Sequence, residues 1–158
     1  MWPEQVERVA AELRAGAVEA TLQEFPEGTG TAQEAARAIG CDLTEVVKSI
    51  VLVCDATVVL ALVPGDRRTD LAKVAAAVGA ADARIADARE VMAATGFEPG
   101  AVAPLGLRAV RVVLLEQTLL PHERVWVGAG SPVHMAGLAP SELQRLTGAR
   151  TADLVEQR

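Results

Sequence analysis

Residues 46–63 read VVKSIVLVCDATVVLALV, and this stretch decides the fold. Two runs of β-branched and apolar residues, Val46–Cys54 and Thr57–Val63, lie on either side of the short turn Asp55-Ala56. Two such runs separated by two residues predict a β-hairpin. The remaining elements are interpreted around this hairpin.

Helices are expected on both sides of the hairpin. Thr31 stands three residues before Glu34 in the pattern of a capping box, and Gly40 provides the matching helix end. Asp87 and Ser141 are further N-cap candidates. The expected helices are Pro3–Arg14, Ala32–Ile39, Asp70–Val78, Asp87–Ala94 and Ser141–Leu146.

Further short apolar runs predict strands at Arg84–Ala86, Ala109–Leu115, Arg124–Val127 and Ser131–Met135. Helices and strands do not alternate strictly, which argues against a doubly wound parallel sheet. The expected class is α/β, with a mixed, largely antiparallel sheet surrounded by helices. One domain covering residues 1–158 is expected, because no linker or internal repeat divides the chain.

Composition narrows the classes of function. Hydrophobic residues make up 51% and charged residues 23% of the chain, as in a globular protein, and no apolar run is long enough to span a membrane. The start of the chain lacks the cationic segment and apolar core of a secretory signal, so a cytoplasmic location is expected. Cys41 and Cys54 are expected to be reduced structural thiols.

The formal net charge of −6 argues against a protein that coats nucleic acid non-specifically, because phosphate binding needs clustered cations. Gripping only the end of a nucleic acid needs a few cations around one pocket. The candidates for such a local contact are Lys48, Arg67, Arg68 and Lys73.

Lys48 is one of only two lysines, and it stands in a strand of otherwise apolar and small residues. Its ammonium must lie either in solvent at the strand edge or in a polar cavity, because an unpaired buried charge is costly. In a cavity it could meet a phosphate, a carboxylate or a developing oxyanion.

Two glycine-containing segments can bring backbone close to a ligand. Residues 96–104, GFEPGAVAP, form a loop that can aim N–H groups at an oxyanion or can serve as a plain connector. Residues 128–131, GAGS, lack the third glycine and the acidic residue of a dinucleotide-binding loop. Ser131 also lacks the G-x-S-x-G pattern of a nucleophile elbow.

The familiar catalytic constellations are missing from the sequence. His122 and His134 lack metal-ligand spacing and are expected to be ordinary surface or half-buried histidines. No Ser-His-Asp set, metal cluster or P-loop is evident, so no metal or other cofactor is expected.

Five segments, in order, resemble the YbaK/ProX family of free-standing aminoacyl-tRNA editing proteins. They are residues 31–36 (TAQEAA), 47–51 (VKSIV), 61–68 (ALVPGDRR), 95–106 (TGFEPGAVAPLG) and 128–130 (GAG). The same domain resembles the editing insertion of bacterial prolyl-tRNA synthetase. The resemblance implies hydrolysis of amino acids wrongly esterified to tRNA, chiefly cysteine or alanine on the tRNA for proline.

The resemblance also implies a site. Lys48 is the family's characteristic lysine and would orient the ester near the terminal phosphate or ribose, while Gly100 would let backbone N–H groups approach the ester carbonyl. The other expected substrate contacts are Gly96, Pro104, Gly128, Ala129, Gly130 and Ser131. The expected partners are the acceptor end of aminoacyl-tRNA and prolyl-tRNA synthetase, with no DNA and no membrane.

Two details place the chain within the family. The turn after Val127 lacks the histidine-bearing pattern of alanine-editing members, so the chain is nearer the YbaK branch, where the substrate is cysteine. In that branch the thiol of the substrate is thought to attack the ester; otherwise a bound water would do so. Glu116 stands where the family usually has an aspartate, which leaves the role of this carboxylate open.

Two other functions stay open. A non-catalytic module of the same fold could bind tRNA or a synthetase, and a small-molecule or nucleotide-binding protein could use the glycine-rich loops.

Overall fold

The computed structural model describes residues 2–107 and 109–158. Its helices are α1 (Glu4–Ala15), α2 (Ala32–Ile39), α3 (Leu71–Ala77), α4 (Ala88–Thr95) and α5 (Pro140–Thr147). Its strands are β1 (Thr21–Glu24), β2 (Val47–Cys54), β3 (Thr57–Pro64), β4 (Ala83–Ile85), β5 (Val112–Glu116), β6 (Val125–Gly128), β7 (His134–Leu138) and β8 (Arg150–Ala152). Short 3-10 turns occupy Leu43–Glu45 and Gln117–Leu119.

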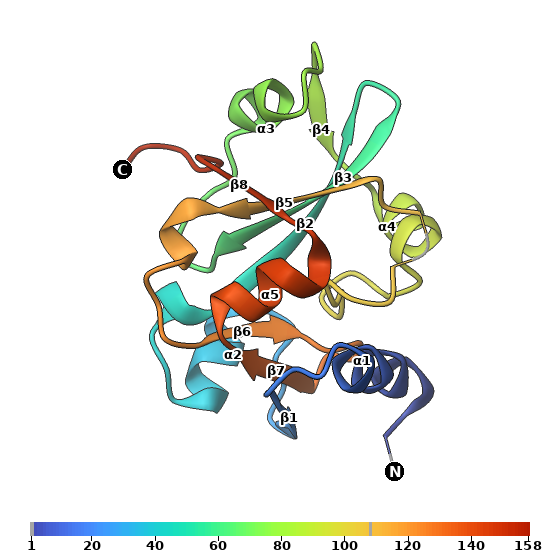
Figure 1. Cartoon of the computed structure of the whole chain (residues 1–158), viewed down its shortest axis with the longest axis vertical. Helices are drawn as coiled ribbons and strands as arrows, with labels where there is room; N and C mark the ends of the chain where they lie inside the picture. The colour runs from blue at the N-terminus through green and yellow to red at the C-terminus, as the bar shows by residue number, and fades with distance from the viewer. Residues whose placement is uncertain (1, 108) are drawn as a thin grey trace.

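The predicted hairpin lies at the centre of a five-stranded sheet of order β4-β2-β3-β5-β8 (Figure 1). β2 and β3 pair antiparallel from Val47 opposite Pro64 to Cys54 opposite Thr57. β4 joins β2 antiparallel, whereas β5 runs parallel to both β3 and β8. The large sheet is therefore mixed.

The other strands form a separate antiparallel sheet of order β1-β7-β6. A parallel bridge between Val46 and Trp126 connects the two sheets at the start of β2. The α/β class with largely antiparallel pairing is confirmed, but the strands divide between two sheets where the sequence analysis expected one.

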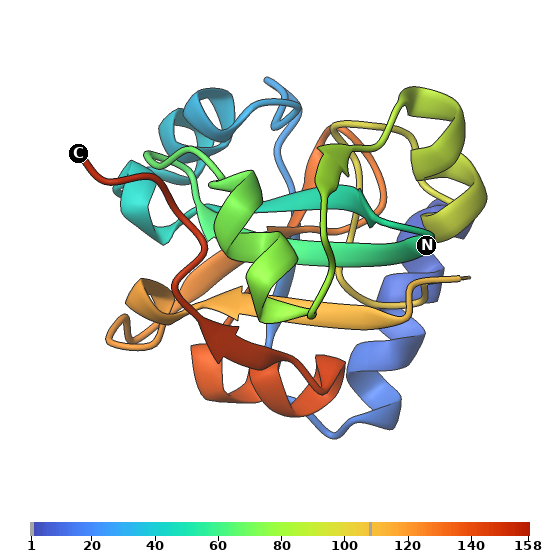
Figure 2. The same cartoon turned by 90° about the horizontal axis from the view of Figure 1, so that it is seen from above.

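The alternation of side chains along the strands builds three apolar layers. Leu60 and Leu62 of β3 face the main core, which also receives side chains of α1, α4, α5 and the small sheet. Val59 and Ala61 face the opposite side, where α3 lies across the large sheet (Figure 2). A third cluster holds α2 against the small sheet through Trp126. The main core thus lies between one face of the large sheet and the small sheet together with α1, α4 and α5, while α3 covers the other face of the large sheet and α2 packs on the small sheet.

Local signals correctly predicted most element boundaries. The Thr31 hydroxyl accepts a hydrogen bond of 3.1 Å from the Glu34 N–H, and Gly40 ends α2 with a left-handed φ of 81°. Asp87 and Glu90 form a reciprocal capping box at α4. These caps are correct because they depend only on neighbouring residues.

Three predicted boundaries were wrong. The strand expected at Ala109–Leu115 is β5, which begins only at Val112, because its pairing with β3 starts there, opposite Val59. The strand expected at Ser131–Met135 is β7, which begins only at His134, because residues 131–133 form a turn in which the Ser131 hydroxyl accepts from the Val133 N–H. α5 is capped by Ala139 and begins at Pro140 instead of being capped by Ser141, since proline is well suited to the first turn of a helix.

Candidate functional site

A cavity of about 330 Å³ opens where β2, α2 and the small sheet meet. Its wall combines the turn before α2, the first half of β2, the loop after α4 and the ends of β6 and β7. The lining residues are Thr29, Gly30, Thr31, Ala32, Ala35, Val46, Val47, Lys48, Ser49, Ile50, Gly100, Val102, Gly128 and Met135.

The cavity lies beside an unpaired stretch of the β2 edge. β3 pairs with one edge of β2 over its whole length, but β4 pairs with the other edge only from Leu52. The Val46 carbonyl accepts from Gly65 on the β3 side, whereas the Val51 carbonyl accepts from Ala86 on the opposite side. Because backbone groups alternate along a strand, Ser49 directs its N–H and C=O to the same side as Val51, towards the gap in the sheet.

Lys48 is half-buried at this cavity. Its ammonium donates a hydrogen bond of 2.5 Å to the carbonyl of Arg67, in the loop that follows β3. Burial lowers the pKa of Lys48, the nearby Asp66 carboxylate raises it, and Arg68 lowers it further. The lysine therefore carries a partly desolvated charge with a single hydrogen-bond partner among the described residues.

Ser49 was missed by the sequence analysis. Its hydroxyl oxygen is buried at the cavity wall and has no hydrogen-bond partner within residues 2–107 and 109–158. The available signal was a small polar residue in a run that is otherwise apolar apart from Lys48. A buried hydroxyl without a partner costs free energy, so a ligand that reaches it gains a hydrogen bond that the free protein lacks.

Gly100 contributes to the same wall as Lys48. Its φ of 84° is in the left-handed region, and a Cβ there would lie 3.3 Å from the Gly30 carbonyl oxygen. The loop after α4 and the turn before α2 therefore approach each other through two glycines. A side chain at Gly100 would strain this backbone and crowd the cavity.

The Gly128–Gly130 turn holds that loop in place. A Cβ on Gly128 would lie 2.5 Å from the Val102 carbonyl oxygen, and the Gly130 N–H donates to the Ala101 carbonyl at 3.1 Å. Gly128 lines the cavity, whereas Ala129 and Gly130 are buried beside it and do not.

Three other predicted contacts lie outside the cavity lining. Gly96 ends α4 in a left-handed conformation, and Pro104 is buried in the core-facing part of its loop. The hydroxyl oxygen of Ser131 lies 2.6 Å from Nδ1 of His134. A substrate-binding role for these residues stays a prediction.

His134 corrects one expectation. It is 3% exposed and packs edge-on against Trp2, so it is a core residue instead of a surface or half-buried one. His122 is half-buried, as expected. Across the described ranges, no three His, Cys, Asp or Glu side chains gather as metal ligands, and no helix is long and apolar enough to cross a membrane.

The comparisons with known proteins identify the family. A family model described as the aminoacyl-tRNA editing domain matches residues 26–146, which include every lining residue of the cavity. The chain belongs to the aminoacyl-tRNA editing domain family. This membership confirms the resemblance drawn from the sequence and, with it, an aminoacyl-tRNA editing domain.

Individual relatives agree with the family match. The chain is 38% identical over 112 residues to a proline–tRNA ligase of Xanthomonas oryzae, a match that covers 68% of this chain and 20% of the ligase. It is 26% identical over 125 residues to EbsC of Enterococcus faecalis, a proposed Cys-tRNA(Pro)/Cys-tRNA(Cys) deacylase, covering 78% of this chain and 76% of EbsC. The editing domain thus spans about a fifth of the ligases it matches.

A solved structure extends the likeness to the whole fold. The crystal structure of a proposed trans-editing enzyme for prolyl-tRNA synthetase matches with a TM-score of 0.90 and 36% identity, and the match covers 99% of this chain and 100% of that chain. The two α/β folds are therefore the same from end to end.

Proposed function

We propose that this editing domain works in trans as one free-standing domain in the cytoplasm, where it hydrolyses a small amino acid wrongly esterified to the tRNA for proline. Cysteine is the first candidate for that amino acid. The observation that carries the proposal is the open cavity beside Lys48, Ser49 and Gly100 in a chain of this family. The tRNA for proline is suggested by the similarity to proline–tRNA ligases.

The cavity suits a small, weakly polar side chain. Its volume is about 330 Å³, and part of that space must hold the terminal ribose. Much of its wall is apolar, with Ala35, Val102 and Met135 among the lining residues. Apolar walls discriminate between similar amino acids by only about 1–3 kcal/mol per methylene, so these walls alone separate cysteine from proline only weakly.

The chemistry needs positioning more than a strong protein nucleophile. Attack on the ester carbonyl breaks its bond to the ribose oxygen, and water as the nucleophile yields free amino acid and tRNA. With cysteine as substrate, its own thiolate can attack the ester carbonyl first, which forms a cyclic thioester and releases the tRNA, and water then hydrolyses the thioester to free cysteine. Lys48 would orient the terminal phosphate or ribose, and the backbone around Gly100 would stabilise the oxyanion.

The contact with tRNA is expected to be local. The chain has a net charge of −6, and among the cations nearest the cavity Lys48 and Arg67 already bond to protein carbonyls. Arg68 is exposed and close to Lys48. Binding should therefore involve mainly the acceptor end, and prolyl-tRNA synthetase is a candidate partner for selecting the tRNA.

A deacylation screen tests the proposal. The tRNA for proline is charged with cysteine, alanine, serine or proline, and hydrolysis is followed with and without the protein. Faster release of cysteine than of proline is the expected result. Tight binding of charged tRNA with no acceleration for any amino acid would instead favour the non-catalytic module.

A further inference from the structure

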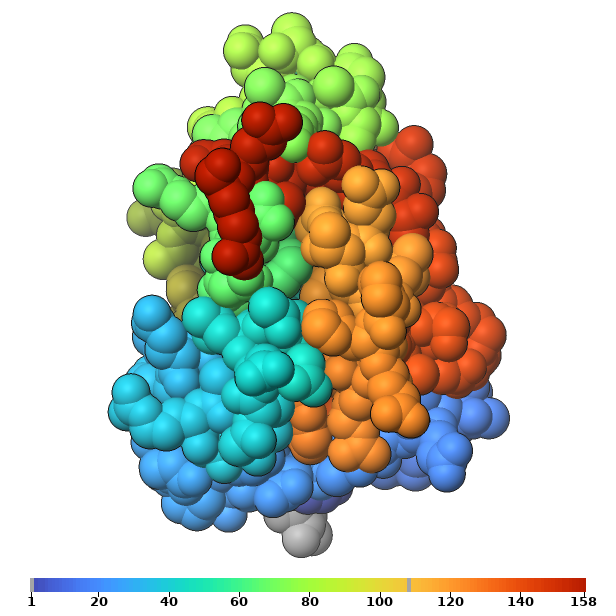
Figure 3. All heavy atoms as spheres, turned by 90° about the vertical axis from the view of Figure 1, so that its left-hand side faces the viewer, coloured from blue at the N-terminus to red at the C-terminus, as the bar shows by residue number. Residues whose placement is uncertain are grey.

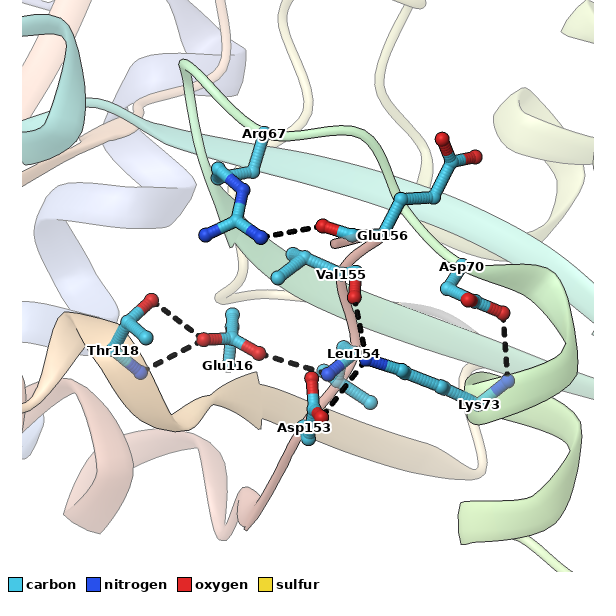
Figure 4. Close-up of polar contacts among 9 residues, drawn as sticks. All are labelled: Arg67, Asp70, Lys73, Glu116, Thr118, Asp153, Leu154, Val155 and Glu156. Atoms are coloured by element: carbon cyan, nitrogen blue, oxygen red, sulfur yellow. Dashed lines mark hydrogen bonds and ion pairs between the residues drawn. The ribbon is translucent and has the colours of Figure 1, made fainter. Parts of the chain in front are cut away.

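Glu116, whose role the sequence left open, is a fully buried carboxylate at the end of β5. One oxygen accepts from the Thr118 N–H at 2.8 Å and from the Thr118 hydroxyl at 2.5 Å (Figure 4). The other accepts from the Leu154 N–H at 2.8 Å. The carboxylate therefore fixes the chain just after β8 to the end of β5.

Residues 153–158, here called the C-terminal segment, continue from this anchor across the molecule. The Asp70 N–H donates to the Leu154 carbonyl at 2.8 Å, and the Glu156 N–H donates to the Arg68 carbonyl at 2.9 Å. Lys73 donates to the Val155 carbonyl at 2.7 Å. Figure 3 shows the segment in dark red, lying on the surface against the green stretch that follows β3.

The stretch that the segment holds, residues 65–70, is the loop that binds Lys48. The Arg67 carbonyl accepts from the Lys48 ammonium, and the Arg67 guanidinium donates to the Glu156 carbonyl. Arg158 forms an ion pair with Asp66, the carboxylate that raises the pKa of Lys48. The 65–70 loop thus lies between the cavity lysine and the C-terminal segment.

We propose that Glu116 is a positioning residue for Lys48, acting through the C-terminal segment and the 65–70 loop. This inference rests on the role proposed for Lys48. Bonds to a buried carboxylate are charge-assisted and therefore strong. Within the described residues, the 65–70 loop and the C-terminal segment belong to no helix or strand and share one isolated bridge, between Thr69 and Val155. Losing the anchor lets the Arg67 carbonyl, and with it the lysine, move.

Glu116→Gln is the sharpest variant because glutamine has the same shape. The carboxylate only accepts, and its donors include two backbone N–H groups, one on each oxygen. An amide must direct its NH₂ at one of these N–H groups, so one bond is replaced by a clash of donors. Glu116→Asp keeps the charge and should therefore restore part of what Glu116→Gln loses.

The kinetic test is a double-variant cycle with cysteinyl-tRNA for proline as substrate. Glu116→Gln should lower kcat about 10-fold with KM changed less than about 2-fold, because displacement of a positioning group affects the reacting geometry more than binding. In a Lys48→Ala background the same change should have almost no further effect. An equal loss in both backgrounds, or wild-type kcat in the single variant, would overturn the proposal.

A second readout does not need activity. The chain has only two lysines, so the rate at which an amine reagent modifies each can be followed by peptide mass spectrometry. Glu116→Gln should speed modification of Lys48 several-fold. The control is Leu143→Ala, which destabilises a buried site in α5 and should leave the modification rate of Lys48 unchanged as long as the protein is folded. Unchanged Lys48 reactivity would overturn the proposal even if the wild type proves inactive, in which case the deacylase proposal fails separately.

Lys73→Met guards against a Glu116 variant that does not fold. Lys73 is partly exposed and bonds to Asp153 and Val155, so its loss loosens the C-terminal segment without disturbing the core. It should raise Lys48 reactivity and lower kcat by smaller factors than Glu116→Gln. No change in either quantity would contradict a role for the segment.

Discussion

Two polar sites on the large sheet differ in how completely they are satisfied. At the end of β5, both oxygens of the buried Glu116 carboxylate accept hydrogen bonds from the protein. On β2, the buried Ser49 hydroxyl has no partner among the described residues, and Lys48 has one carbonyl. The closed site is complete in the free protein and serves architecture. The open site leaves bonds to be made, which is what a binding site requires.

The difference follows from strand pairing. Glu116 lies where β5 and β8 are paired and where the chain turns back to supply donors. Ser49 lies in the gap between the bridge at Val46 and the end of β4, and its hydroxyl finds no hydrogen-bond partner within the part of the chain that the structure describes. An unpaired buried hydroxyl costs about 1–3 kcal/mol, and retaining it is consistent with a functional use.

The largest expected effect on activity comes from removing Lys48, the cation of the open site. Lys48→Ala should lower kcat/KM for deacylation about 100-fold or more, since removing a group that orients or stabilises the reacting charge typically costs that much. Far-UV circular dichroism and thermal unfolding should show a folded protein.

Arg84→Ala is the matched control for Lys48→Ala. It also removes one cation, but from an exposed pair with Glu90 outside the cavity lining. It should keep wild-type kcat/KM. Wild-type activity in folded Lys48→Ala would show that the open site is not the catalytic one.

The next largest effect concerns the loop facing Lys48. Gly100→Val should lower kcat/KM about 10–100-fold, because a side chain there narrows the cavity and displaces the loop from Gly30. Gly40→Val separates crowding from backbone strain, since Gly40 has a similar φ of 81° but nothing within 4 Å of its Cβ position. Equal activities for the two variants would mean that Gly100 acts only through stability.

Ser49→Ala tests the role of the unpaired Ser49 hydroxyl directly. It should lower kcat/KM about 10-fold, the value of one lost hydrogen bond, while raising the free energy of unfolding by up to about 1 kcal/mol. Ser131→Ala is the contrasting stability control, because the Ser131 hydroxyl is bonded to Val133 and His134 and its loss should destabilise the fold. A destabilised Ser49→Ala would show that the hydroxyl has a partner in solution and that the comparison is wrong.

The sequence predicted features that depend on neighbours in the chain. The hairpin followed from two apolar runs and a turn, and α2 followed from Thr31, Glu34 and Gly40. β1 and β8 were missed because they are short and largely polar or exposed, and each forms only by pairing with a distant strand.

The candidate site divides in the same way. Lys48 and Gly100 could be found because a lysine in an apolar strand and a glycine-rich loop are visible locally. The unpaired state of the Ser49 hydroxyl could not, since it depends on β4 ending opposite Leu52. The need for glycine at position 128 was equally hidden, because it arises from the Val102 carbonyl of another segment.

The smallest expected effect is on stability, and it concerns the charge of Lys48. Burial holds the pKa of Lys48 below its ordinary value in the folded protein. In the unfolded chain that pKa is about 10.4, so between the two values the unfolded chain binds more protons and the stability contribution of Lys48 rises with pH. Below the folded pKa the full desolvation cost is present, partly offset by the bond to Arg67.

Lys48→Met removes both the desolvation cost and the hydrogen bond, so near neutral pH the free energies of unfolding of the two proteins should differ by no more than about 0.5–1 kcal/mol. Urea unfolding at a series of pH values up to about 10 should then show the free energy of unfolding of the wild type rising relative to that of Lys48→Met as the pH approaches the unfolded pKa. A difference that stays constant over this range would mean that Lys48 is as well solvated in the folded protein as in the unfolded chain, and the open site would lose its partly desolvated charge.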